Sequence, residues 1–197
     1  MKRIFMLMAV ALMLVAAMAL SGVAQAAGSP SAKCQQEAAS LGLNLVGYKF
    51  IGGNNKKNDD FTRKATTGVP EVFCGLGGND SIRTLNENDI FIGGAGGDYV
   101  TDNNGTFIGG TGDDYVQGFN SGTFNGGDGS DSVSNKNQGT FNGGDGSDSV
   151  ATNYGTFNGG AGDDYVLYNN GTFNGGDGTD AVVYPDSSTG TFNQDAL

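Results

Sequence analysis

The sequence contains no histidine, no tryptophan, only two cysteines and only three prolines among 197 residues. Without histidine, the chain can form neither a histidine-based zinc site nor a Ser-His catalytic pair. Carboxylates, cysteine, tyrosine and lysine are the side chains left for metal binding or acid–base chemistry. The composition therefore narrows the candidate functions before any motif is considered.

Cationic side chains are almost absent from residues 75–197, where only Arg83 and Lys136 stand against sixteen Asp and one Glu. A polypeptide this acidic repels nucleic acid and anionic membranes and favours cations. A disordered acidic tail is the alternative explanation of such a composition. The regularity of the sequence argues against disorder, so we expect a cation as partner and no nucleic acid.

The first 27 residues have the pattern of an export signal. Lys2 and Arg3 precede an apolar run from Ile4 to Leu20, and Val23 to Ala27 offers small residues for cleavage. A membrane-spanning helix is the alternative, because the apolar run approaches the length that a bilayer requires. We expect cleavage, a secreted protein, and no membrane insertion afterwards. In an oxidising compartment, Cys34 and Cys74 would form a disulfide.

A repeat dominates the chain after residue 72. Seven segments each contain a Phe, a glycine loop that ends in Asp, and an aliphatic residue, as in Phe124-Asn125-GGDGSD-Ser132-Val133. The step from Phe to the aliphatic residue is nine in all seven segments, whereas the step to the next Phe varies between 7 and 10. Surface loops usually vary in length. The constant step therefore indicates that the length of the glycine loop is constrained, as it would be if the loop bound a ligand.

Alternation around each Phe and each aliphatic residue predicts two very short, half-buried strands per segment. Neither strand could bury its apolar residue alone, so successive segments should stack. We therefore predict an all-β fold, a parallel β-roll or β-solenoid of about seven short coils over residues 73–197. The Asn-rich turns that end in Gly, such as Asn103-Asn104-Gly105, are expected to be plain corners.

The loop sequence G-G-x-G-x-D resembles the nonapeptide of RTX (haemolysin-type) calcium-binding repeats, over roughly residues 72–183. The resemblance implies that each calcium ion lies between consecutive loops, bound by carbonyls of the Gly-x-Gly segment and by the sixth-position Asp, which gives about six ions. The glycines that it implies are Gly94, Gly96, Gly110, Gly112, Gly127, Gly129, Gly144, Gly146, Gly160, Gly162, Gly176 and Gly178. Alternate nonapeptides lack the motif here, so calcium should line one edge only. The N-terminal export signal also differs from the C-terminal signal of type I-secreted RTX toxins and proteases, which puts their activities in doubt for this chain.

Electrostatics predict a cation independently of the resemblance. Stacking places one sixth-position Asp above another, namely Asp80, Asp98, Asp114, Asp131, Asp148, Asp164 and Asp180. Further carboxylates lie in the same loops at Asp113, Asp128, Asp145, Asp163 and Asp177. Two like charges about 5 Å apart repel by roughly 3 kcal/mol at an effective dielectric constant of about 20. Calcium, which takes six to eight oxygen ligands, suits such loops better than magnesium does.

Residues 28–72 are expected to form an N-terminal cap. Phe50-Ile51-Gly52-Gly53 echoes Phe91-Ile92-Gly93-Gly94, but Asn55-Lys56-Lys57 follows where acidic residues should be, so we expect a degenerate coil that ends the column. A Cys34–Cys74 bridge would tie this cap to the first repeat.

The function predicted from these patterns is a secreted calcium-binding structural or interaction module whose folding depends on the metal. The alternative is recognition of ice, an extracellular polymer or a cell-surface component by an outward ladder, formed by Thr106, Thr123, Thr140, Thr156 and Thr172 beside Asn125, Asn142, Asn158 and Asn174. Irregular coil lengths would disturb such a lattice. An enzyme is not expected, because the roughly 45 residues outside the repeats contain no visible nucleophile–base pair.

Overall fold

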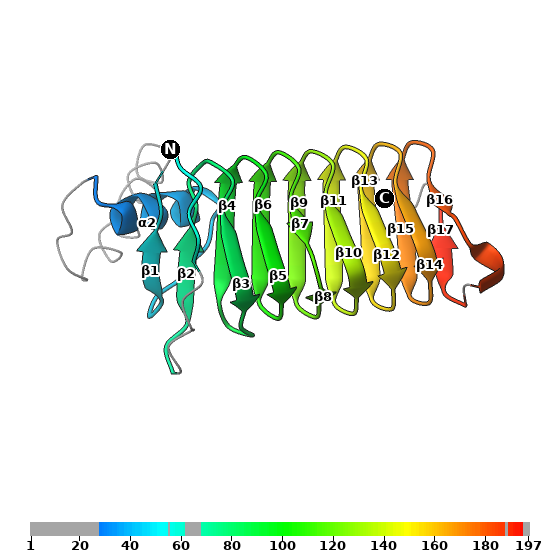
Figure 1. Cartoon of the computed structure of the whole chain (residues 1–197), viewed down its shortest axis with the longest axis horizontal. Coiled ribbons are helices and arrows are strands. Elements are labelled where there is room, and N and C mark those ends of the chain that lie inside the picture. Colours follow the sequence, from blue (N-terminus) through cyan, green and yellow to red (C-terminus); the bar gives the residue numbers. More distant parts are fainter. Residues whose placement is uncertain (1–27, 55, 62–67, 188, 195–197) are drawn as a thin grey trace, which may run out of the picture.

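The computed structural model describes residues 28–54, 56–61, 68–187 and 189–194. The chain winds as a β-solenoid whose two parallel sheets face each other (Figure 1). Sheet A contains β1 (Lys49–Gly52), β2 (Glu71–Cys74), β4 (Ile90–Ala95), β6 (Thr106–Thr111), β9 (Thr123–Asp128), β11 (Thr140–Asp145), β13 (Thr156–Ala161), β15 (Thr172–Asp177) and β17 (Thr191–Asn193). Sheet B contains β3 (Ser81–Leu85), β5 (Tyr99–Asn103), β7 (Tyr115–Val116), β8 (Phe119–Asn120), β10 (Ser132–Asn137), β12 (Ser149–Asn153), β14 (Tyr165–Asn169) and β16 (Ala181–Val182). The predicted stack of about seven coils is confirmed.

Phenylalanine rings from sheet A form the central row of the core. The strands pair in register, so Phe124 lies between Phe107 and Phe141 with ring centroids 4.7 Å and 4.6 Å away. Val116 and Val133 pair in the same way in sheet B, and both are buried. The spacing of the stacked rings is close to the distance between neighbouring strands, about 4.8 Å. Each coil thus buries its apolar residues against the next coil, as the repeat predicted.

Variation in coil length falls within sheet B and in the connections that lead from sheet B back to sheet A. The register shifts between Val133 and Lys136 in β10, and the strand of the preceding coil is split into β7 and β8. Sheet A keeps one register from β4 to β15, with Thr (Ile90 in β4), Phe, and Asn or Ile in three fixed rows. Insertions therefore leave the outer face of sheet A regular, contrary to the expectation that they would disturb it.

The Asn-rich corners are not plain turns. The first Asn of each corner is buried and donates through Nδ2 to Oδ1 of the next one, as Asn120 does to Asn137 at 2.7 Å. The same Nδ2 also donates to the carbonyl oxygen of Thr140 at 3.0 Å. These residues form an internal amide ladder comprising Asn103, Asn120, Asn137, Asn153 and Asn169. The sequence interpretation missed it because Asn is common in both turns and ladders.

Helix α2 (Pro30–Ser40) is capped by Ser29, whose side chain accepts a hydrogen bond from the Ala32 N–H at 3.2 Å. The helix packs on the outer face of sheet A, where Cys34 and Ala38 join a buried cluster with Val72, Cys74 and Ile92. The Cys34–Cys74 disulfide confirms the predicted bridge. This segment covers the outer face of the first coils, which explains why Ile and Cys stand there in place of the outward Thr and Asn of later coils.

The coil that precedes the repeats is shifted by one residue from the alignment expected from the sequence, which matched Phe50 with the core Phe of the repeats. Ile51, not Phe50, pairs with Phe73 and so takes the place of the core Phe. Phe61 reaches the same core, with its ring centroid 5.7 Å from that of Phe73. The remaining element, η1 (Pro185–Ser187), precedes β17 at the opposite end. The predicted signal peptide lies outside the described residues, and no helix among the described residues is long and apolar enough to cross a membrane.

Candidate metal-binding column

Each glycine loop follows a sheet A strand and turns through two positive-φ residues, which are both glycines except in the first loop, where Leu76 precedes Gly78. In the second loop these are Gly94 with φ 106° and Gly96 with φ 126°. A Cβ atom at Gly110 would collide with the carbonyl oxygen of Gly94 in the preceding coil. All twelve glycines that the resemblance selected adopt positive φ. They are therefore required by the backbone geometry and by the close stacking of the loops, whether or not a metal is bound.

The seven sixth-position aspartates lie in one buried column. All have relative exposures of 0–1% except Asp180, which has 7%. The backbone N–H of each Asp before Asp180 donates to Oδ1 of the Asp in the next coil; for example, the N–H of Asp114 donates to Asp131 at 2.7 Å. The chain of hydrogen bonds runs without a break from Asp80 to Asp180. One oxygen of each carboxylate thus links neighbouring coils.

The second oxygen of these carboxylates is buried without a hydrogen-bond partner. This holds for Oδ2 of Asp80, Asp98, Asp114, Asp131, Asp148 and Asp164. A Cβ at the first glycine of the loop, Gly126, would collide with Oδ2 of Asp131 and would lie 2.7 Å from the carbonyl oxygen of Gly143. A carboxylate oxygen and a carbonyl oxygen of the next coil therefore approach the same point. The sequence interpretation named the second and fourth glycines but missed this first one.

Burial raises the pKa of these carboxyl groups. Desolvation is the largest cause, and neighbouring carboxylates raise the pKa further, whereas the backbone hydrogen bonds lower it. The pKa of Asp98 rises to about 7, that of Asp114 to about 8 and that of Asp148 to about 7. The pKa values of Asp80, Asp131 and Asp164 rise to about 6. The column therefore favours either protons or another positive charge.

The column extends beyond the predicted residues at both ends. At the N-terminal end, the N–H of Asp59 donates to Oδ1 of Asp80 at 2.6 Å. Asp59 therefore occupies the next position of the column, although the Asn55-Lys56-Lys57 sequence had led us to expect no acidic residue in this coil. The degenerate coil therefore continues the column and does not end it. At the other end, Nε2 of Gln194 donates to Oδ2 of Asp180 at 3.1 Å. These two residues were missed because neither lies within a complete loop motif.

Glu37 of α2 adds a carboxylate near the start of the column. Its Oε2 is buried without a hydrogen-bond partner. Burial raises the pKa of Glu37, and the charge of Asp80 raises it further. The sequence interpretation did not associate Glu37 with the column, because only the folding of α2 onto sheet A brings them together.

The other five predicted carboxylates lie outside the column. Asp113, Asp128, Asp145, Asp163 and Asp177 are all solvent-exposed. Oδ1 of Asp113 accepts a hydrogen bond from the Ser130 N–H, and Oδ1 of Asp163 accepts one from the Thr179 N–H, both at 2.9 Å. The structure thus separates the predicted ligands into a buried column and an exposed row.

No group of three or more Cys, Asp or Glu side chains converges on a metal-sized point within the described parts of the chain. A cation in the column would therefore need backbone oxygens beside the one free oxygen that each Asp supplies.

Comparisons with protein-family models, with curated proteins and with solved structures found no match to this chain.

Proposed function

We propose that the chain is a secreted calcium-binding β-roll, a structural or interaction module whose folding is coupled to calcium. The observation that carries the proposal is the row of six buried Oδ2 atoms without hydrogen-bond partners. Leaving a buried polar atom unsatisfied costs about 1–3 kcal/mol, and more for a charged group. A ligand that satisfies all six atoms would stabilise the fold strongly.

Within the described parts of the chain, no cationic side chain forms an ion pair with this column. Among the described residues, the one ion pair joins Lys49 and Glu71, away from the loops. Carboxylates in neighbouring coils, about 4.8 Å apart, repel each other when ionised. Calcium would neutralise them and would use carbonyl oxygens of the loop glycines along the stack, such as that of Gly143 beside Gly126.

The residues present fit calcium better than the transition metals. The candidate donors are carboxylate and carbonyl oxygens, which hard cations prefer, and both cysteines are held in the disulfide. The RTX-like spacing of the loops supports the same choice. Asp80, Asp98, Asp114, Asp131, Asp148 and Asp164 would each supply one oxygen, with loop carbonyls as the remaining ligands, giving about six ions.

An extracellular location is part of the proposal. The disulfide and the signal-like N-terminal sequence both favour an oxidising compartment. We assign no catalytic activity to the chain, because its candidate chemistry is confined to carboxylates and backbone oxygens.

A calcium titration of metal-stripped protein tests the proposal. Far-UV circular dichroism should show a gain of strand signal at submillimolar to millimolar calcium, isothermal calorimetry should count several ions, and magnesium should have little effect. Protein that is already folded in excess chelator and that binds no calcium would refute it.

Recognition of an extended polymer or of ice by sheet A is the second candidate. The favourable observation is the unbroken register of the outer Thr and Asn rows from β9 to β17. The outer Asn side chains also bond to one another, as Asn158 does to Asn142 at 2.7 Å, which fixes their spacing. Replacing Thr140 and Thr156 with Lys would abolish binding to such a lattice. Absence of thermal hysteresis and of ice shaping would remove the ice-binding form.

A further inference from the structure

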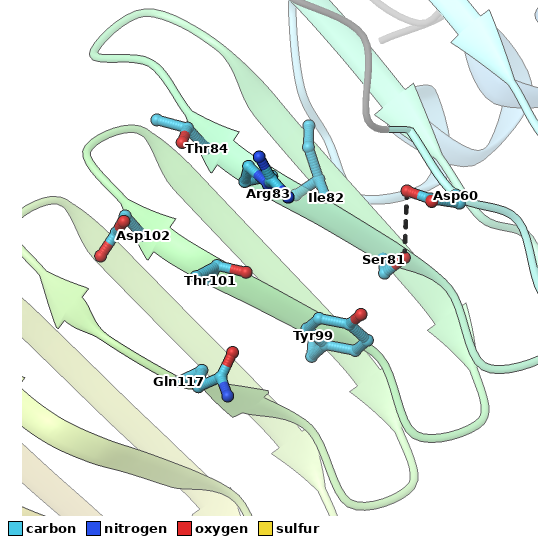
Figure 2. A pocket seen from close by; sticks show the side chains of 9 residues that line it. All are labelled: Asp60, Ser81, Ile82, Arg83, Thr84, Tyr99, Thr101, Asp102 and Gln117. Atoms are coloured by element: carbon cyan, nitrogen blue, oxygen red, sulfur yellow. Dashed lines mark hydrogen bonds between the residues drawn. The ribbon is translucent and has the colours of Figure 1, made fainter.

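A polar hollow of about 540 Å³ lies on the outer face of sheet B near its first strands. Figure 2 shows the side chains that line it, which come from β3, from β5, from Gln117 just after β7, and from Asp60 beside β3. Its volume is within the range of small-molecule sites, about 300–1,000 Å³. The hollow is separate from the aspartate column, which is buried.

One ring face of Tyr99 is open toward this hollow. The other face stacks on Tyr115, with ring centroids 5.1 Å apart and an interplanar angle of 9°. The neighbour in register on the open side is Ser81, which is too small to cover the ring. The next residue in the same row is Asp60, which forms an isolated parallel bridge with Ser81. Asp60 and Tyr99 are thus two strand spacings apart, about 9.6 Å, with only a serine between them.

Carboxylates and hydroxyls line this hollow, and hydrogen bonds hold two of the carboxylates in place. The Ser81 Oγ donates to Oδ1 of Asp60 at 3.4 Å, as the dashed line in Figure 2 marks. Oδ1 of Asp102 accepts a hydrogen bond from the Phe119 N–H at 3.2 Å, which anchors that carboxylate to the sheet. Arg83 lies between them along β3 and forms no ion pair within the described residues. Its guanidinium donors remain available for a ligand.

We propose that this hollow binds one hexose ring of a neutral glycan. A pyranose has an apolar face that can stack on Tyr99 at roughly 4.5 Å and hydroxyls that can reach Asp60 at about 2.7 Å. A flat aromatic ligand would displace water from Asp60, Arg83 and Asp102 and offer them no hydroxyl in exchange, which is unfavourable. An acidic sugar would meet two carboxylates and one guanidinium. The chemistry of the hollow therefore selects a neutral sugar, and the inference depends on the fold but not on calcium.

Affinity electrophoresis of the purified protein through gels with neutral polysaccharides of glucose, mannose or galactose tests this site. At least one of them should retard the protein, and polygalacturonate should not. Tyr99→Ser should weaken that retardation at least tenfold, and Arg83→Met, on an exposed side chain outside the core, should weaken it by several fold. Titration of the corresponding free monosaccharide distinguishes recognition of a single ring from recognition that requires the polymer.

The matched control is Tyr165→Ser. Tyr165 occupies the same row, is 42% exposed and has Ser149 and Ala181 on its two sides, but it does not line the hollow. Its replacement should change the retardation less than twofold. The site is overturned if no neutral polysaccharide retards the protein, or if the Tyr99 and Tyr165 variants lose binding equally. Circular dichroism of each variant separates loss of the site from loss of the fold.

Discussion

Asp131 accepts a hydrogen bond from the backbone N–H of Asp114 at 2.7 Å through Oδ1, while its other carboxylate oxygen is buried without a partner. The carboxylate of Asp131 thus has two structural roles. Its first oxygen joins two coils, and its second oxygen leaves a charge in the interior that must be neutralised.

Without metal, the stability of the protein should fall as the pH rises. The pKa values of the column carboxyls are raised to about 6–8, against roughly 3.9 for an unfolded Asp. Between these values the folded state binds more protons than the unfolded state, so the free energy of unfolding decreases with pH. Thermal melting in excess chelator should show Tm falling from pH 4 to pH 8. A Tm that rises over this range would contradict the raised pKa values.

Calcium should flatten or reverse that dependence, because it competes with protons for the same oxygens. The same melts with 5–10 mM calcium, roughly at or above the Kd of the weakest extracellular calcium modules, should show the largest stabilisation at pH 8. Identical curves with and without calcium would argue that protons alone neutralise the column.

Asp148→Asn should raise the stability of the metal-free protein at pH 8 and lower the number of calcium ions bound. The amide oxygen can still accept the hydrogen bond from the Asp131 N–H, while the buried negative charge is removed. Because an interleaved site uses two coils, this central replacement should affect two ions. Asp180→Asn, at the end that Gln194 covers, should affect about one.

The control for these variants is Asp145→Asn, since Asp145 lies in the same loop as Asp148 but is exposed. Calorimetry should find its calcium stoichiometry unchanged. Equal losses in Asp145→Asn and Asp148→Asn would place the ions in the exposed row.

Phe141→Ala should destabilise the protein by about 3–5 kcal/mol, because it opens a cavity in the middle of the stacked rings. Phe141 is fully buried between Phe124 and Phe157. Phe192→Ala should cost clearly less, because Phe192 stacks on one ring only and is 37% exposed. Urea denaturation of both variants in calcium measures the difference, and equal losses would contradict the described core.

Reduction of the Cys34–Cys74 disulfide should loosen residues 28–54 without unwinding the later coils. The bond spans 40 residues, and closing a loop of this length stabilises a fold by up to about 4 kcal/mol on the chain-entropy estimate. Hydrogen exchange should show faster amide exchange in α2 and β1 than in β11 and β13 after reduction. Uniform acceleration throughout the solenoid would show that the bond supports the whole stack.

The core and the aspartate column could be predicted because both depend on a constant step along the chain. Nine residues from Phe124 to Val133 fix one complete side of a coil, and repetition then places Asp131 above Asp148 without any long-range information. Asp59, Glu37 and Gln194 could not be placed in this way, because they lie outside complete motifs and meet the column only after the chain ends fold against it.

The sequence by itself determined the parallel solenoid, its coil number and the buried Phe and Val rows, since stacking similar short units leaves one way to bury their apolar residues. It also determined the bonded cysteine pair, because the chain has only two cysteines. Only the tertiary structure decided where the length variation goes, which Asn residues turn inward, and which face α2 covers. It also decided that the loop carboxylates divide between the interior and the surface, and that Asp60 and Tyr99 lie on opposite sides of Ser81 in one row. These features depend on packing between coils and on the chain ends, and neighbouring residues in the sequence do not specify them.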